Sequence, residues 1–193
     1  MSPDEIHSLF TELGVLRTGH FELSSGVHSD TYVQCARALQ HPRTARRLGE
    51  ALAERTKHID ADVVASPAVG GVLAGFVVAD ALDRRFIFAE RYGGEMVFRR
   101  GQGPELGERV LLVEDVVTTG GSAMEVAARC QSAGASVVGL ASLVDRSGAL
   151  AADARPALPP VALLELAPQV WEPDACPQCR DGRALDRPGS RPG

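Results

Sequence analysis

The chain carries the sequence VLLVEDVVTTGGS at residues 110–122. Four apolar residues predict a buried strand, two adjacent carboxylates end it, and small residues then lead into a helix expected over residues 121–133. Glycines let the backbone approach a bound anion, and the amides of a helix N-terminus favour negative charge. The segment therefore predicts a phosphate-binding turn. It lacks the Gly-Lys-Ser/Thr element of a Walker P-loop and the GxGxxG pattern of a dinucleotide-binding turn.

Two carboxylates, Glu114 and Asp115, come immediately before this turn. Carboxylates placed about one sugar length from a phosphate site suit the vicinal hydroxyls of a ribose 5-phosphate. The hydroxyls of Thr118, Thr119 and Ser122 add hydrogen-bond donors for the phosphate. The alternative is a capped strand–turn–helix whose two acids are merely solvated.

The alternation of apolar strands and helices continues on both sides of this segment. Further strands are expected at residues 63–65, 86–89, 137–144 and 161–166, and further helices at residues 3–13, 42–57 and 70–82. Between them lie a polar, turn-rich stretch at residues 20–32 and a glycine-rich arm at residues 93–107 with a short strand at 96–98. Apolar strands separated by helices predict an α/β fold with a mainly parallel sheet of about five strands, flanked by helices. Ligands of such sheets bind beyond the carboxyl ends of the strands.

Composition and charge exclude several classes of protein. The chain has 193 residues, of which 45% are hydrophobic and 23% charged, and a net charge of -5. This balance is typical of a globular protein and disfavours nonspecific binding of nucleic acid, which needs a basic face. We see neither an apolar run long enough to span a membrane nor a secretory signal, so we expect a cytoplasmic protein without a membrane partner. Lys57 is the only lysine, so an anion site must use arginine or backbone amides.

Four cysteines occur, at positions 35, 130, 176 and 179. Cys35 and Cys130 are expected to be small buried hydrophobic residues. Cys176 and Cys179 form a CxxC pair, for which free thiols, a disulfide and a metal site stay open. A tetrahedral zinc site needs two more ligands, and neither a second CxxC nor a nearby histidine pair follows from the spacing.

Several motifs together resemble one known family. Residues 110–122 resemble the phosphoribosyl-diphosphate signature of type I phosphoribosyltransferases, and SPAVGG at residues 66–71 resembles their pyrophosphate loop. FELSSGVHS at residues 21–29, followed by Tyr32, resembles the N-terminal substrate loop of the orotate phosphoribosyltransferases. Asp145-Arg146 resembles the pair whose arginine holds the orotate carboxylate. The resemblance covers roughly residues 1–150.

The resemblance implies a type I phosphoribosyltransferase fold with a small hood. We expect one domain over residues 1–172, with the hood and substrate loop at 1–40 and the sheet core at 60–150, and a Pro- and Cys-containing tail at 173–193. The tail is expected to contribute to the hood and to be mobile from about residue 180. The implied reaction transfers ribose 5-phosphate from 5-phospho-α-D-ribose 1-diphosphate to orotate, giving orotidine 5′-monophosphate and pyrophosphate in pyrimidine synthesis.

The resemblance also assigns residues to roles. Glu114, Asp115 and Arg91 are the implied catalytic residues, and Tyr32, Thr118 and Arg146 the implied orotate contacts. Contacts to the diphosphate substrate are implied for Glu114, Asp115, Val116, Val117, Thr118, Thr119, Gly120, Gly121, Ser122, Arg91, Arg99 and Arg100. Magnesium is expected to be held through the substrate, without direct protein ligands. A homodimer is expected, in which Arg91, Arg99 or Arg100 serves the neighbouring site.

The chain departs from the family where lysines are usual. Ser24 and Gly70 stand where relatives often carry lysine, and residues 59–193 contain neither lysine nor histidine. Two other functions therefore stay open: transfer to a purine base, and a non-catalytic regulator that binds RNA. At single positions, Arg146 could instead pair with Asp145 at the surface, and Tyr32 could be a core residue.

Overall fold

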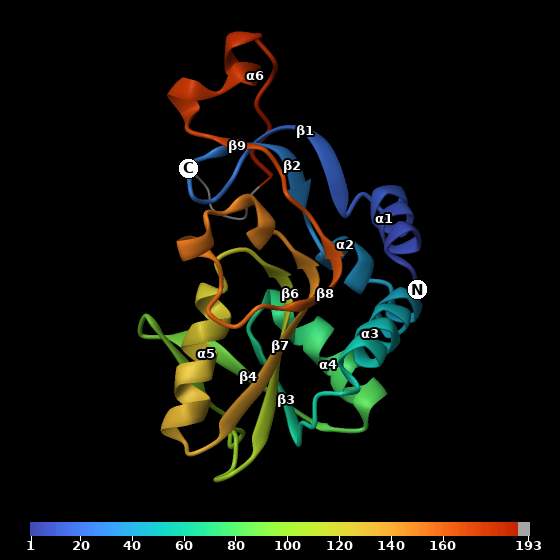
Figure 1. The fold of residues 1–193 in the computed structure, drawn as a ribbon, viewed down its shortest axis with the longest axis vertical. Coiled ribbons are helices and arrows are strands. Elements are labelled where there is room, and N and C mark those ends of the chain that lie inside the picture. Colours follow the sequence, from blue (N-terminus) through green and yellow to red (C-terminus); the bar gives the residue numbers. More distant parts are fainter. Residues whose placement is uncertain (189–193) are drawn as a thin grey trace.

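The centre of the molecule is a six-stranded sheet (Figure 1). The computed structural model describes residues 1–188, and the strand order is β5-β4-β3-β6-β7-β8. All neighbouring strands are parallel except β4 and β5, which are antiparallel. The strands are β3 (Val63–Pro67), β4 (Arg85–Tyr92), β5 (Glu95–Phe98), β6 (Arg109–Val117), β7 (Ser136–Asp145) and β8 (Val161–Glu165). The predicted α/β class with a mainly parallel sheet is confirmed.

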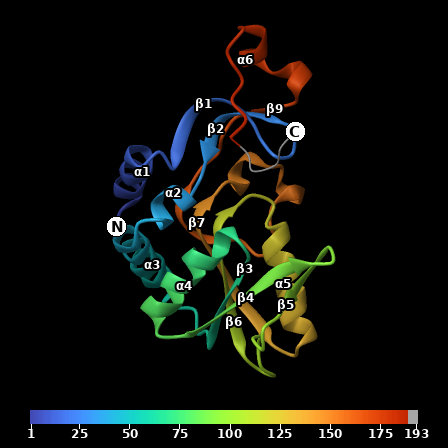
Figure 2. The same cartoon turned by 180° about the vertical axis from the view of Figure 1, so that it is seen from behind.

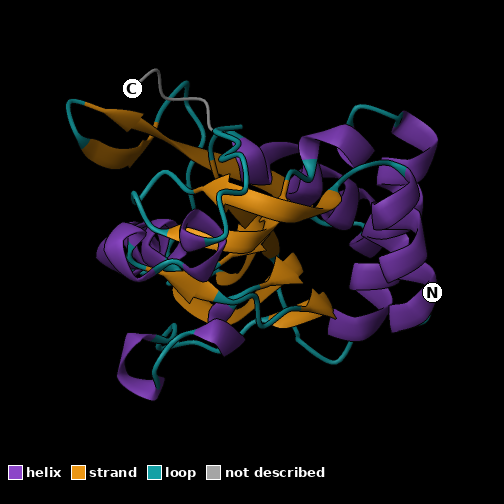
Figure 3. Cartoon of the chain, turned by 90° about the horizontal axis from the view of Figure 1, so that it is seen from above, coloured by secondary structure: helices purple, strands orange, loops and turns teal. Residues whose placement is uncertain are grey.

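Helices cover both faces of this sheet, as the view from above shows (Figure 3). One face carries α1, α3 and α4, with the short α2 beside them, and the other carries α5 (Figure 1). Their bounds are α1 (Pro3–Glu12), α2 (Ala36–Leu39), α3 (Pro42–Thr56), α4 (Gly70–Leu82) and α5 (Gly121–Ser132). Alternate side chains of β6 serve the two faces: Leu111 and Val113 pack in the α1/α3/α4 core, and Val110 and Leu112 in the α5 core. This explains the continuous apolar run, since a strand buried on both faces needs apolar residues at every position.

A second, three-stranded sheet lies beyond the carboxyl ends of the central strands (Figures 1 and 2). It consists of β1 (Leu16–Glu22), β2 (His28–Val33) and β9 (Val170–Trp171), all antiparallel. The stretch predicted to be turn-rich at residues 20–32 is therefore largely a β-hairpin. Its buried positions include the polar residues His20, His28 and Ser29, so the apolar alternation that marks a half-buried strand is missing. We call residues 16–33 together with β9 the hood.

The tail returns to the hood and lies against β1. After the short elements η1 (Ser147–Ala149), η2 (Ala152–Ala154), η3 (Pro173–Ala175) and α6 (Pro177–Arg180), the chain meets Phe21 in a parallel bridge at Asp186. The Asp186 amide donates to the His20 carbonyl at 2.8 Å, and its carbonyl accepts from the Glu22 amide at 2.9 Å. Residues 181–188 are thus held in place, where mobility had been expected; residues 189–193 lie outside the described part. Within residues 1–188 no helix is both long and apolar enough to cross a lipid bilayer.

Candidate functional site

The predicted phosphate turn joins the end of β6 to the start of α5. Gly120 has a φ of 72° and precedes the first residue of α5, a left-handed conformation that glycine adopts without strain. A side chain there would also crowd Pro156, 3.0 Å from a Cβ built on Gly120. The turn borders a pocket of about 350 Å³ lined by Glu114, Val116, Thr118, Thr119, Gly120, Gly121, Ser122 and Glu125. The pocket therefore meets the amides at the N-terminus of a three-turn helix, where an anion is favoured.

The two carboxylates of the acid pair serve two different loops. Glu114 lines the pocket described above, whereas Asp115 lies against Gly70, at the start of α4. Burial, and then the neighbouring charge of Asp115, raise the pKa of Glu114 to about 7. Burial also raises the pKa of Asp115. A ligand that donates hydrogen bonds or carries positive charge here would stabilise both ionised forms.

The segment at residues 66–71 leaves the carboxyl end of β3 and enters α4. Its Ala68–Val69 peptide is cis, and Val69 is exposed. A Cβ on Gly70 would lie 2.7 Å from Oδ1 of Asp115, so the loop approaches the acid pair as closely as a backbone can. The two segments that resembled the diphosphate signature and the pyrophosphate loop are thus neighbours at one edge of the sheet.

The three arginines proposed for the diphosphate do not lie together. Arg91, at the end of β4, donates to Oε1 of Glu125 at 2.8 Å and to the carbonyl of Gly94 at 2.7 Å, which places it at the rim of the pocket. The hydrogen bond and ion pair between Arg91 and Glu125 lower the pKa of Glu125 and raise that of Arg91. Arg99 and Arg100 instead pair with Glu90, at 3.4 and 3.1 Å.

The strand geometry explains this separation. Consecutive residues of a strand face opposite sides, so Glu90 draws its two arginines to one side of β4 while Arg91 faces α5 on the other. Arg99 also lies over the ring of Tyr92, 4.1 Å from its centroid. Among the three arginines proposed for the diphosphate, Arg91 is the one that this chain brings to its own phosphate turn.

Arg146 lies next to the phosphate turn. Its amide donates to the carbonyl of Val117 at 2.8 Å, so it stands beside the residue that precedes Thr118. The side chain of Val117 is fully buried, so it offers no side-chain contact to a ligand. Arg146 is 9% exposed, and its Nε is buried with no hydrogen-bond acceptor among the described residues. Burial lowers the pKa of Arg146, and Asp30 and Tyr32 act against that shift.

Tyr32 belongs to the hood and faces the same region. Its ring packs against Phe21 with centroids 5.7 Å apart, and its hydroxyl donates weakly to the carbonyl of Pro188 at 3.4 Å. Tyr32 lies close enough to Arg146 to influence the pKa of its guanidinium. The surface ion pair between Asp145 and Arg146 that sequence left open is not formed, because Asp145 accepts from the Ser147 amide at 2.7 Å instead.

Two residues of the site carry no signal in the sequence. Glu125 lines the pocket and holds Arg91, yet as one acid in the second turn of a helix it resembles any solvated residue. Asp30 belongs to the hood and acts on Arg146 only because the hairpin folds over the carboxyl end of β7. Both roles depend on tertiary contacts and not on spacing.

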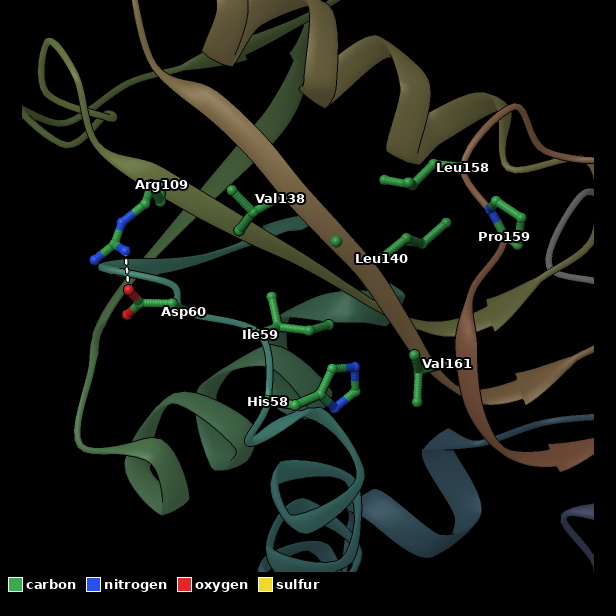
Figure 4. Close-up of a pocket in the computed structure, with 10 residues that line it drawn as sticks. His58, Ile59, Asp60, Arg109, Val138, Leu140, Leu158, Pro159 and Val161 are labelled. Atoms are coloured by element: carbon green, nitrogen blue, oxygen red, sulfur yellow. Dashed lines mark hydrogen bonds and ion pairs between the residues drawn. The ribbon is translucent and has the colours of Figure 1, made fainter.

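A second pocket, of about 540 Å³, opens at the amino ends of β6, β7 and β8 (Figure 4). Apolar side chains line most of it, and Arg109 at its edge is paired with Asp60 and Asp62. It therefore lies at the edge of the sheet opposite the acid pair. Because ligands of open α/β sheets bind at the carboxyl ends of the strands, the pocket at residues 114–125 is the candidate site.

Comparisons with known proteins point to one family. The phosphoribosyl transferase domain model matches residues 36–157. The orotate phosphoribosyltransferase of Desulforamulus reducens is 43% identical over 99% of this chain and 98% of its own length, and that of Thermotoga maritima is 45% identical over 96% and 98%. A solved Mycobacterium tuberculosis orotate phosphoribosyltransferase, in complex with 5-phospho-α-D-ribosyl 1-diphosphate, is 25% identical with a TM-score of 0.61, over 86% of this chain and 92% of that one.

Proposed function

The chain belongs to the orotate phosphoribosyltransferase family, and we propose that it carries out this reaction in the pocket between β6 and α5. The reaction breaks the bond between C1 of the ribose and the pyrophosphate oxygen, and forms a bond from C1 to N1 of orotate, whose N1 proton is released to pyrophosphate or solvent. Its products are orotidine 5′-monophosphate and pyrophosphate. The observation that supports the site most directly is Arg146 beside the phosphate turn, whose buried Nε has no hydrogen-bond acceptor within residues 1–188.

The diphosphate substrate would occupy both loops of the site. The amides and hydroxyls of residues 118–122 would hold the 5-phosphate, and the carboxylates of Glu114 and Asp115 would accept from the ribose hydroxyls. Because Asp115 faces Gly70, the pyrophosphate would extend toward residues 66–71. Arg91 would neutralise charge on the leaving group, with Glu125 as the residue that positions it. An arginine stabilises such charge well but donates protons poorly, since its pKa exceeds about 12.

Orotate would lie between the turn and the hood. A guanidinium matches a carboxylate in a bidentate, charge-assisted pair, and Arg146 has no such partner among the described residues. Thr118 would contact the same base, and Tyr32 would close over it from the hood. A purine base has no carboxylate for Arg146, which is why this residue favours orotate over the purine alternative.

Magnesium fits the donors of this site. The cation prefers oxygen ligands. Among the described residues, no positively charged side chain lowers the pKa of Glu114 or Asp115, so their negative charge is not already neutralised by the protein. We propose that it would be held through the diphosphate and ribose oxygens, without direct protein ligands. When bound it supplies positive charge to the leaving pyrophosphate. Cys35 and Cys130, both buried free thiols, are consistent with a cytoplasmic setting, where we place the reaction.

A spectrophotometric assay tests the proposed function. The ultraviolet absorbance of orotate is followed with 5-phospho-α-D-ribose 1-diphosphate, with and without magnesium, and adenine, guanine, hypoxanthine and uracil serve as control bases. We expect a magnesium-dependent change with orotate alone. Binding of the diphosphate by calorimetry without turnover of orotate would overturn the assignment.

A further inference from the structure

Four side chains from distant parts of the sequence meet where the tail reaches the hood. They are His20 on β1, His28 on β2, and Cys176 and Cys179 at and in α6. One nitrogen or sulfur atom of each lies within 4.8 Å of all the others. His20, His28 and Cys176 are buried, with at most 5% exposure, and Cys179 closes the cluster on the solvent side. The histidine pair that the CxxC spacing could not supply is thus provided by the hairpin.

Four of the six distances within the cluster match the edges of a metal-centred tetrahedron. Zinc bonds of about 2.0 Å to nitrogen and about 2.3 Å to sulfur give N···N edges of about 3.3 Å and N···S edges of about 3.5 Å. The Nε2 of His20 lies 3.1 Å from Nδ1 of His28 and 3.4 Å from Sγ of Cys176. The Sγ of Cys179 lies 3.6 Å from the same Nε2 and 3.3 Å from Nδ1 of His28.

A hydrogen bond outside the cluster fixes the tautomer of His20 that can bind a metal. Nδ1 of His20 lies 3.1 Å from the carbonyl of Arg183. Because a carbonyl only accepts, Nδ1 must carry the proton, and the lone pair of His20 is then on Nε2, the atom that faces the other three. Metal-bound histidines are oriented by such a bond from the second ring nitrogen. Arg183 belongs to the tail, so the same bond also joins the tail to β1.

Apolar packing contributes little to the local fold of the tail. Between residues 173 and 188 only Cys176 and Gln178 are buried, and α6 has four residues. A segment of this size without an apolar core usually needs a disulfide or a metal to stay folded. Both cysteines of the CxxC pair are free.

We propose that His20, His28, Cys176 and Cys179 bind one zinc ion, which fastens the tail to the hood. Two thiolates and two imidazoles in a tetrahedron are a donor set that zinc favours. With four protein ligands the ion has no open position, so its role is structural and it takes no part in the transfer reaction. The proposal does not depend on the proposed function, because zinc content is measured without substrate.

Metal content is the first test, on protein without a polyhistidine tag. After gel filtration, elemental analysis of the wild type should find one zinc per chain. Cys176→Ala and the double variant Cys176→Ala/Cys179→Ala should lose at least nine-tenths of it. Cys130→Ala is the matched control, because it removes a buried thiol on α5, away from the cluster, and should keep the full zinc content. Zinc retained by the double variant would overturn the proposal.

A second test uses the wild type alone and so does not depend on how the variants fold. Zinc is removed with a chelator, and Co²⁺ is added in a reducing buffer. We expect the visible bands of tetrahedral, thiolate-bound cobalt at one equivalent, and their loss when zinc is returned. The single tryptophan, Trp171, pairs with His28 between β9 and β2, so its fluorescence should shift on zinc removal and recover on zinc addition. Wild type with neither zinc nor a cobalt spectrum, or with Cys176 and Cys179 joined in a disulfide, contradicts the proposal.

Discussion

The carboxylate of Asp115 occupies the space beside Gly70 that any other residue would need: a Cβ built on Gly70 lies 2.7 Å from its Oδ1 and 3.0 Å from its Oδ2. Glycine at this position therefore lets the pyrophosphate loop and the acid pair touch. The lysine that relatives often carry at this position would displace the carboxylate. The observed position of Asp115 therefore requires glycine at position 70.

We predict that Gly70→Ala impairs transfer with little loss of stability. The methyl group would push the Asp115 carboxylate aside, and a displacement of about 1 Å in a site of this kind costs roughly a hundredfold in rate. Steady-state kinetics should show a decrease in kcat/KM for the diphosphate of between about tenfold and a hundredfold. Gly103→Ala is the control, because its Cβ would meet only ordinary contacts with Phe98. Equal activity of the two variants would contradict the argument.

The raised pKa of Glu114 predicts a pH dependence of stability. Its pKa of about 7 exceeds the ordinary glutamate pKa of 4.5, so the folded chain holds this proton where the unfolded chain has released it. Stability from this group is therefore full below about pH 4.5 and is lost as the pH rises toward 7, by roughly 3 kcal/mol. Urea unfolding at pH 5 and pH 8 should show a larger loss for the wild type than for Glu114→Gln. Equal losses in the two proteins would show that Glu114 is already charged at pH 5.

Replacing Arg146 should separate the two substrates. Arg146→Ala removes the proposed partner of the orotate carboxylate, and a charge-assisted pair of this kind contributes about 2–3 kcal/mol, or roughly thirty- to a hundredfold in affinity. We expect KM for orotate to rise by that factor. The affinity for the diphosphate, measured by calorimetry, should change less than about threefold. Equal loss for both ligands would show that Arg146 supports the turn and does not hold the base.

The positions of Arg99 and Arg100 lead to a prediction about assembly. Both lie on the side of β4 opposite Arg91, and we propose that they serve the site of a second copy in a homodimer. Sedimentation should give the mass of two chains. An inactive Asp115→Asn chain mixed with an Arg99→Ala/Arg100→Ala chain should recover up to about a quarter of the wild-type rate, since random pairing makes half of the dimers hybrids with one complete site. Mixtures without recovery would place these arginines at their own chain's site or outside catalysis.

The centre of the sheet was predictable because strands β3 and β6 are buried on both faces over most of their length. Leu111 and Val113 face one core and Val110 and Leu112 the other, so the run stays apolar whatever the register. The phosphate turn was equally visible, since glycine at position 120 meets a local requirement for positive φ. Both features depend on residues that are adjacent in the sequence.

The hood was not predictable by the same means. His20, His28 and Ser29 are polar residues at buried positions, so a pattern based on hydrophobicity points to turns. His20 and Cys176 are 156 positions apart, and nothing in their spacing shows that they meet. Likewise, Glu90 decides where Arg99 and Arg100 lie, although one charged pair among many surface residues has no distinctive sequence pattern.

The bridge between Phe21 and Asp186 has a consequence for the order in which parts of the protein fold during synthesis. On the ribosome, residues 16–33 emerge early but cannot complete their sheet until residues 170–186 have been synthesised, whereas the central strands need nothing beyond β8. The phosphate turn is therefore assembled first and the cover over the base last. Under the proposed function, a nascent chain would therefore form its sugar-phosphate site before its base site.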